Sequence, residues 1–191
     1  MNKSDLVNSV MDKKSDSASA QPSTAEMGST LDGLYRRPGV LFRRAHQIAA
    51  GIFMQECAAL ALTPPQHSTL YVIGRQPGLN QAEIARALGF DRATIGQIIE
   101  GLATRGLIDR SNSTGSKRDK ALTLTPAGRE LLRAAEQPVR IMSERLLSPL
   151  TPGERMLMIE LLLKVTTSLN SESRTPLTVP RAARAADTAA Q

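Results

Sequence analysis

The chain has 191 residues, enough for one domain with tails, and its formal charge of +6 favours a polyanionic partner. Its 3% aromatic content, with no Trp, argues against stacking platforms for single strands or RNA, and its single Cys excludes an internal disulfide framework. No apolar run approaches the ~20 residues of a membrane span and the N-terminus lacks the apolar core of a signal peptide, so we expect a cytoplasmic protein with no membrane partner.

The first residues differ in character from the segment that follows them. Residues 1–33 are rich in Ser, Ala, Lys and Asp and lack apolar periodicity, which predicts a disordered tail. A helix is expected over residues 38–62, where apolar side chains form two adjacent lines, one through Leu41 and the other through Phe42. A helix this apolar needs a partner surface.

A short helix is expected next. Pro64 opens it, and residues 76–78 (Gln-Pro-Gly) end it. We expect Leu70, Tyr71 and Ile73 to face inward.

Two helices separated by a tight turn are predicted over residues 80–106. Asn80 and Glu83 have the spacing of a capping box, Gly89 suits a left-handed helix end, and Asp91 suits the N-cap of the second helix. The apolar residues of that second helix recur at helical spacing: Ile95, Ile98, Ile99 and Leu102.

The pattern then changes to that of a β-hairpin. Leu122 and Leu124 alternate with more polar residues, as in a strand, and residues 111–120 form a polar, basic loop before it. Helix, turn, helix and basic hairpin in this order constitute a winged helix-turn-helix. We therefore expect a reader of duplex DNA.

The DNA contacts are expected on the exposed face of the second helix and in the wing. Arg92 and Thr94 suit phosphates or base edges, and Gln97 suits adenine. Glu100 could accept from cytosine, although solvation is the preferred interpretation. The complete predicted set is Gln81, Arg92, Thr94, Gln97, Lys117, Arg118 and Lys120. A merely solvated face is disfavoured because the helix and the wing occur together.

The remaining helices predict a dimerisation bundle. Thr125 and Pro126 have the pattern of an N-cap and first residue, and they start a long helix that Pro138 should strain without ending. A last helix, starting at Thr151, is apolar over most of its circumference, which is too much for the surface of a monomer. Residues 38–62 and 126–169 are therefore assigned to dimerisation, and residues 171–191 to a disordered tail.

This layout resembles the multiple-antibiotic-resistance regulator (MarR) family. The resemblance rests on DRATIGQIIEGLATRGLI and ALTLTPAGRELL, and it covers residues 34–170, with a winged helix-turn-helix at 63–125. It implies a mainly α fold with a small β-hairpin wing. It also implies a homodimer that binds a pseudo-palindromic operator and acts as a repressor released by a small aromatic acid, with its recognition helices about 34–36 Å apart.

The wing departs from the family pattern. An acidic residue ahead of two basic ones usually buttresses the wing, but Ser116 occupies that position here. Asp119 or Asp109 could take over this role.

The segments LYRRPGVLFRRAHQIAAGIF and LTPPQHSTL resemble a branch that controls catabolism of aromatic carboxylates, most closely repressors that respond to a hydroxylated nicotinate. The resemblance places a pocket where the first two helices meet the long helix. A small planar acid such as a hydroxynicotinate or hydroxybenzoate needs apolar walls, a cation and polar tips. The predicted ligand-binding residues are Arg43, with Arg44 as an alternative cation, His46, His67 and Tyr71. For either histidine alone, a satisfied core or boundary residue is the favoured interpretation; for the pair on adjacent helices, a ligand role is equally well supported.

Other chemistries receive less support. Cys57 would allow redox sensing, but the adjacent Glu56 and the helix C-terminus both disfavour a thiolate. A third ligand is missing at zinc spacing, and phosphate-binding glycine loops and nucleophile–base pairs are missing too, so we expect no metal, no cofactor and no catalytic residue. A winged-helix module that binds an acidic protein is the remaining alternative.

Overall fold

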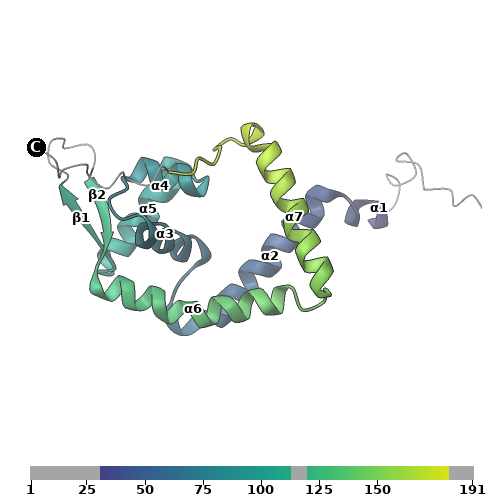
Figure 1. Ribbon diagram of the computed structural model, residues 1–191, viewed down its shortest axis with the longest axis horizontal. Coiled ribbons are helices and arrows are strands. Elements are labelled where there is room, and N and C mark those ends of the chain that lie inside the picture. The colour runs from purple at the N-terminus through teal and green to yellow at the C-terminus, as the bar shows by residue number, and fades with distance from the viewer. Residues whose placement is uncertain (1–30, 113–119, 181–191) are drawn as a thin grey trace, which may run out of the picture. The chain divides into compact units, whose positions relative to one another are not determined.

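The computed structural model describes residues 31–112 and 120–180 (Figure 1). The chain falls into two compact units, Met1–Ala45 and His46–Gln191. In the first unit, α1 (Leu31–Tyr35) is followed by the start of α2 (Pro38–Glu56), which continues into the second unit. Most of the predicted N-terminal tail, residues 1–30, lies outside the described residues. Residues 31–33 begin α1 instead of belonging to a tail.

The second unit holds the helix-turn-helix, the hairpin and two long helices. Its elements are η2 (Ala58–Leu60), α3 (Pro64–Arg75), α4 (Gln81–Leu88), α5 (Arg92–Thr104), β1 (Ile108–Asn112), β2 (Lys120–Leu124), α6 (Pro126–Leu146), α7 (Pro152–Ser168) and η3 (Asn170–Glu172). The strands pair antiparallel, with Ile108 opposite Leu124 and Asn112 opposite Lys120. The predicted mainly α fold with a small β-hairpin is confirmed.

Helices begin at the residues whose side chains satisfy their free N–H groups. Thr63, Asn80 and Thr151 each form a reciprocal capping box with the residue three positions later. Asp91 and Thr125 cap α5 and α6 through one side-chain bond to the backbone. These predicted starts are therefore fixed by local chemistry.

One core joins α3, α4, α5 and the hairpin. Its buried side chains include Leu62, Leu70, Ile73, Ile84, Ile95, Ile99, Leu102, Ile108, Leu122 and Leu124. Tyr71, which was expected to face inward, is 46% exposed. Leu70 and Ile73 are three residues apart and share the buried face, whereas Tyr71 points off that face toward Arg75.

The second helix ends earlier than the sequence predicts, at Glu56 instead of residue 62. A short 3₁₀ turn follows, and Ala61 adopts a left-handed conformation with φ of 48°. This reversal brings Leu62 into the core. Arg105 stabilises it by donating to the carbonyls of Leu60 and Ala61 at 3.3 and 2.8 Å.

The start of α6 is locked onto the winged unit. Thr125 donates from its hydroxyl to the Gly106 carbonyl at 2.7 Å and from its N–H to the Leu107 carbonyl at 3.1 Å. Pro138 lies inside α6 without ending it, as predicted. Hydrogen bonds of Thr125 thus join the winged unit to the long helix at the junction between them.

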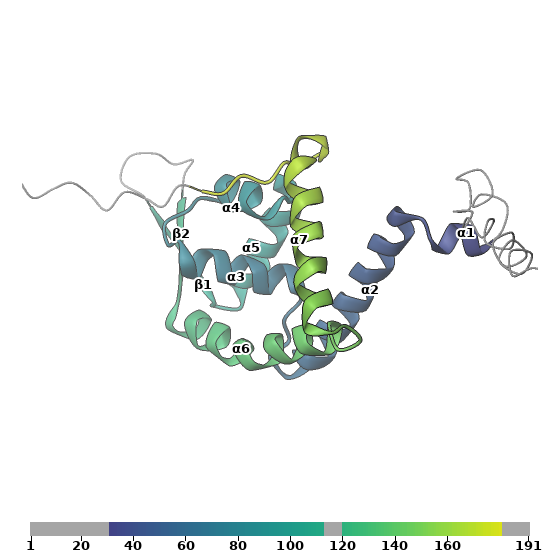
Figure 2. The ribbon, with the colours of Figure 1, turned by 45° about the vertical axis from the view of Figure 1, so that its right-hand side comes forward.

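The end of the described chain differs from the predicted disordered tail. Residues 171–180 follow a defined course from α7 to α4 and bond to it (Figures 1 and 2), whereas residues 181–191 lie outside the described residues. Composition indicated disorder here, but the polar groups of the segment find carbonyl partners on α4 and on the turn that follows it. Among the described residues, no helix is long and apolar enough to cross a membrane.

Candidate nucleic-acid interface and ligand pocket

The first turns of α4 and α5 meet at an exposed edge. Gln81 donates from Nε2 to the Arg92 carbonyl at 3.2 Å, which joins two of the predicted DNA contacts. Gln81, Arg92 and Gln97 are exposed, and Thr94 is half-buried. A Cβ added to Gly96 would lie 2.9 Å from Gln81 Nε2, so glycine at this position leaves room for the Gln81 side chain.

Asp91 fixes the start of α5. Its carboxylate accepts from the Thr94 N–H and from the Thr94 hydroxyl, both at 2.8 Å. These hydrogen bonds lower the pKa of Asp91, which therefore stays ionised at the positive end of the helix. Thr94 is thus held by Asp91, and its hydroxyl oxygen can still accept a hydrogen bond.

An ion pair connects the hairpin to α5. Arg110 on β1 contacts Glu100 on α5 at 2.6 Å, so Glu100 is paired here. Of the residues considered as wing anchors, Asp109 is exposed on β1, and Asp119 lies outside the described residues together with Lys117 and Arg118. For Lys120, the backbone is described, and it pairs with Asn112.

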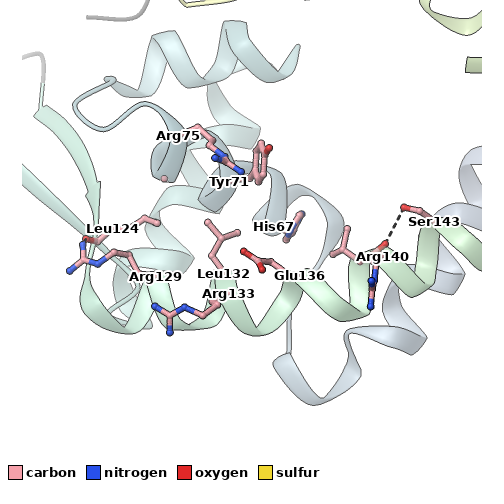
Figure 3. Close-up of a pocket in the computed structure, with 12 residues that line it drawn as sticks. His67, Tyr71, Arg75, Leu124, Arg129, Leu132, Arg133, Glu136, Arg140 and Ser143 are labelled. Carbon is pink, nitrogen blue, oxygen red and sulfur yellow. Dashed lines mark hydrogen bonds between the residues drawn. The ribbon is translucent and has the colours of Figure 1, made fainter. Parts of the chain in front are cut away.

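A cavity of about 560 Å³ lies between α3 and α6 (Figure 3). The residues that line it are His67, Tyr71, Gly74, Arg75, Leu124, Arg129, Leu132, Arg133, Glu136, Val139, Arg140 and Ser143. Apolar side chains and a few charged tips share this lining, which is typical of a site for a small amphipathic molecule.

A row of rings runs from α2 onto α3, and its last two members, His67 and Tyr71, line the pocket. Phe53 and His67 have ring centroids 5.7 Å apart, and His67 and Tyr71 are 6.3 Å apart. The Arg75 guanidinium lies 5.2 Å from the Tyr71 ring centroid, in cation–π geometry. Burial lowers the pKa of His67, so its imidazole is neutral at pH 7 and offers hydrogen bonds instead of charge.

Arg75 supplies the cation on the α3 side of the pocket. In Figure 3, Glu136 points from α6 into the space between the helices, while Arg129 and Arg133 point away from it. The sequence pattern predicts no ligand role for Arg75 or for the residues of α6 that line the pocket. The spacing of Tyr71 and Arg75, one helical turn apart, was the available signal.

The pocket gathers only part of the predicted ligand set. His67 and Tyr71 line it. His46 is exposed and is not among the lining residues, and Arg43 belongs to the first unit, where it is exposed.

Cys57 is fully buried at the end of α2. Burial raises the pKa of its thiol, and the neighbouring Glu56 raises it further. Both effects disfavour the thiolate that redox chemistry requires.

Comparisons with known proteins agree on one family. A sequence model described as the MarR family matches residues 62–119. The repressor NicR of Pseudomonas putida is 34% identical over 144 residues, covering 75% of this chain and 91% of NicR. The repressor CouR, solved on a 23-mer DNA duplex, is 30% identical with a TM-score of 0.68, over 72% of this chain and 97% of CouR.

A further solved relative concerns a ligand. BpsR of Bordetella bronchiseptica, described with the regulation of its DNA binding by 6-hydroxynicotinic acid, is 30% identical with a TM-score of 0.63. The match covers 68% of this chain and 94% of BpsR.

Proposed function

This chain belongs to the MarR family of transcriptional regulators, and we propose that it binds duplex DNA as a homodimeric repressor and releases it when a small aromatic carboxylate enters the pocket. In this proposal the protein has no catalytic role. The observation that carries it is the pairing, in one compact unit, of an exposed recognition helix with an amphipathic pocket behind it.

The DNA-binding part of the proposal rests on the edge where α4 and α5 begin. Gln81, Arg92 and Gln97 are exposed there and offer the donors that phosphates and base edges accept. CouR, with a similar fold, is described bound to a DNA duplex.

Dimerisation is supported by the apolar surface of α7. Seven large apolar side chains of this helix are at least 37% exposed: Met156, Leu157, Ile159, Leu161, Leu162, Leu163 and Val165. A monomer rarely leaves such a surface in water, and a second copy would cover it. Two recognition helices would then face successive major grooves about 34 Å apart.

The ligand class is inferred from the pocket. The rings of His67 and Tyr71, which line the pocket, suit a planar ring, and Arg75 suits its carboxylate. The neutral imidazole of His67 can pair with a ring hydroxyl or nitrogen. BpsR, whose description names 6-hydroxynicotinic acid, makes a hydroxynicotinate the first probe, with a hydroxybenzoate as the second.

The test selects a binding sequence from random duplexes and measures its release by fluorescence anisotropy. We expect 6-hydroxynicotinate to weaken operator binding. Arg75→Gln should raise the concentration of 6-hydroxynicotinate needed for release by about tenfold or more, because the variant loses one charge-assisted hydrogen bond to the ligand. Arg133→Gln, also at the pocket but directed away from it in Figure 3, is the matched control. If neither the hydroxynicotinate nor the hydroxybenzoate released the DNA, the proposed ligand class would be refuted. Failure to select any sequence would refute specific DNA binding.

A further inference from the structure

Residues 170–180 leave the end of α7 and lie against α4 and α3 (Figures 1 and 2). We propose that this segment, the strap, couples the ligand pocket to the helix-turn-helix. The inference rests on the proposed function for the role of the pocket as an effector site, but its test needs neither DNA nor ligand.

One attachment of the strap is the turn between α4 and α5. The Thr178 N–H donates to the Arg86 carbonyl at 2.9 Å, and the Thr175 hydroxyl donates to the Gly89 carbonyl at 2.5 Å. The last carbonyls of a helix have no partner within it, because the chain turns away. Here Phe90 donates to Ala85 rather than to Arg86, and the strap takes the place of the next helical turn.

A pair of hydrogen bonds inside the strap closes it into a loop next to the end of α7. Asn170, just beyond that helix, donates from Nδ2 to the Leu177 carbonyl at 2.9 Å and accepts from the Leu177 N–H at 2.8 Å. This two-way bond closes the loop between the helix end and the bonded residues. The turn before the recognition helix is therefore linked to α7 through a route separate from α6.

The second attachment is at the pocket wall. Val179 and Pro180 line a smaller cavity of about 200 Å³ together with Tyr71, Val72, Arg75, Gln76 and Ala87. Tyr71 and Arg75 also line the larger pocket. The same two side chains thus form a partition, with the ligand pocket on one side and the strap on the other.

One polar atom next to the docked strap has no hydrogen-bond partner among the described residues. This atom is Gln76 Oε1, which is buried at the small cavity. A buried polar atom without a partner carries a desolvation penalty. This penalty falls at the cavity that Val179 and Pro180 line, so it lowers local stability where the strap docks.

These contacts define how the pocket acts on the strap. An anion that draws the Arg75 guanidinium into the larger pocket removes one wall of the small cavity. The strap then loses packing at Pro180, its half-buried residue at this cavity, and releases the carbonyls of Arg86 and Gly89. Asp91, the N-cap of the recognition helix, is two residues beyond Gly89, so the loss reaches the DNA-reading edge.

Amide hydrogen exchange of the full-length, ligand-free protein tests the strap. We expect the Leu177 and Thr178 amides to exchange at least about tenfold more slowly than in an unprotected chain. Thr178→Pro removes the N–H that bonds to Arg86, whereas Thr178→Ala retains it and serves as the matched control. The proline variant, but not the alanine variant, should accelerate exchange of the Phe90 and Ile95 amides at least about threefold.

A second pair of variants tests the partition. Arg75→Gln should accelerate both the strap amides and the Phe90 amide at least about threefold, whereas Arg133→Gln, whose residue lines only the larger pocket, should leave them unchanged. Unprotected strap amides in the natural protein, or equal exchange in Arg75→Gln and Arg133→Gln, would overturn the proposal. A failure of DNA or 6-hydroxynicotinate binding would concern the proposed function alone.

Discussion

Gly128, in the first turn of α6, is the position where a single methyl group should cost most. A Cβ built on it would lie 2.0 Å from the Leu107 carbonyl oxygen and 3.0 Å from the carbonyl carbon. Both groups belong to backbone, so neither can rotate away. Since Cβ atoms stay about 3 Å or more from such neighbours, Gly128→Ala must separate the two segments by about 1 Å.

That separation acts on the junction between the winged unit and α6. It strains two hydrogen bonds of Thr125, one to Gly106 at 2.7 Å and one to Leu107 at 3.1 Å. Overpacking costs about 1–3 kcal/mol, and each hydrogen bond contributes about 1 kcal/mol. We therefore expect Gly128→Ala to lower the free energy of unfolding by about 3 kcal/mol, a large part of the 5–15 kcal/mol typical of a domain.

Urea unfolding followed by circular dichroism, at one fixed protein concentration, measures this loss. The control is Gly101→Ala, inside α5, where an added Cβ meets nothing within 4 Å. Replacing this helical glycine should stabilise the protein by about 0.5–1 kcal/mol. If Gly128→Ala cost less than about 1 kcal/mol, the close approach of α6 to Leu107 would be refuted.

Three further predictions follow from the site. Burial lowers the pKa of His67 below its unfolded value of about 6.5, so the unfolded chain binds more protons below that pH, and stability present at pH 7.5 is lost toward pH 5.5 with a slope of at most about 1.4 kcal/mol per pH unit. The melting temperature should depend less on pH across this range for His67→Gln than for the control His46→Gln. Equal pH slopes for the two variants would contradict the lowered pKa of His67. Gln97→Ala should reduce the preference for the selected operator over random duplex by about 1–3 kcal/mol in anisotropy titrations, and an equal loss on both DNAs would remove its base-reading role. Glu100→Gln should cost less than about 1 kcal/mol in urea unfolding, because its ion pair with Arg110 is partly solvent-exposed, and a loss above about 2 kcal/mol would show a larger structural role.

The features that the sequence predicted well are those set by neighbours along the chain. Asn80 and Glu83 cap α4 from three residues apart, and Gly89 ends it with φ of 66°. Such contacts depend only on local spacing, so they can be predicted from the sequence before the fold is known. The alternation of Leu122 and Leu124 identified the second wing strand for the same reason.

The features that it did not predict depend on segments far apart in the chain. Arg75 lines a cavity that is closed opposite it by α6, whose lining residues lie more than fifty positions later. The strap was interpreted as a tail because its composition is polar, but Thr175 bonds to Gly89, 86 residues away. His46 shares a helix with Phe53, yet only Phe53 reaches the row of rings beside the pocket. Composition and periodicity do not indicate which distant segments of the chain contact each other in the fold.

Under the proposed function, the position of α3 would let one pocket influence the whole helix-turn-helix unit. Leu70 and Ile73 bury one face of α3 in the core with α4, α5 and β2, while Tyr71 and Arg75 turn another face toward α6. Close-packed side chains transmit displacement instead of absorbing it. A ligand that separates α3 from α6 therefore has to move α4 and α5 together with α3, about the junction at Thr125. A ligand bound elsewhere on α6 would not have this effect, because it would not contact α3, which packs against α6 and also against α4 and α5.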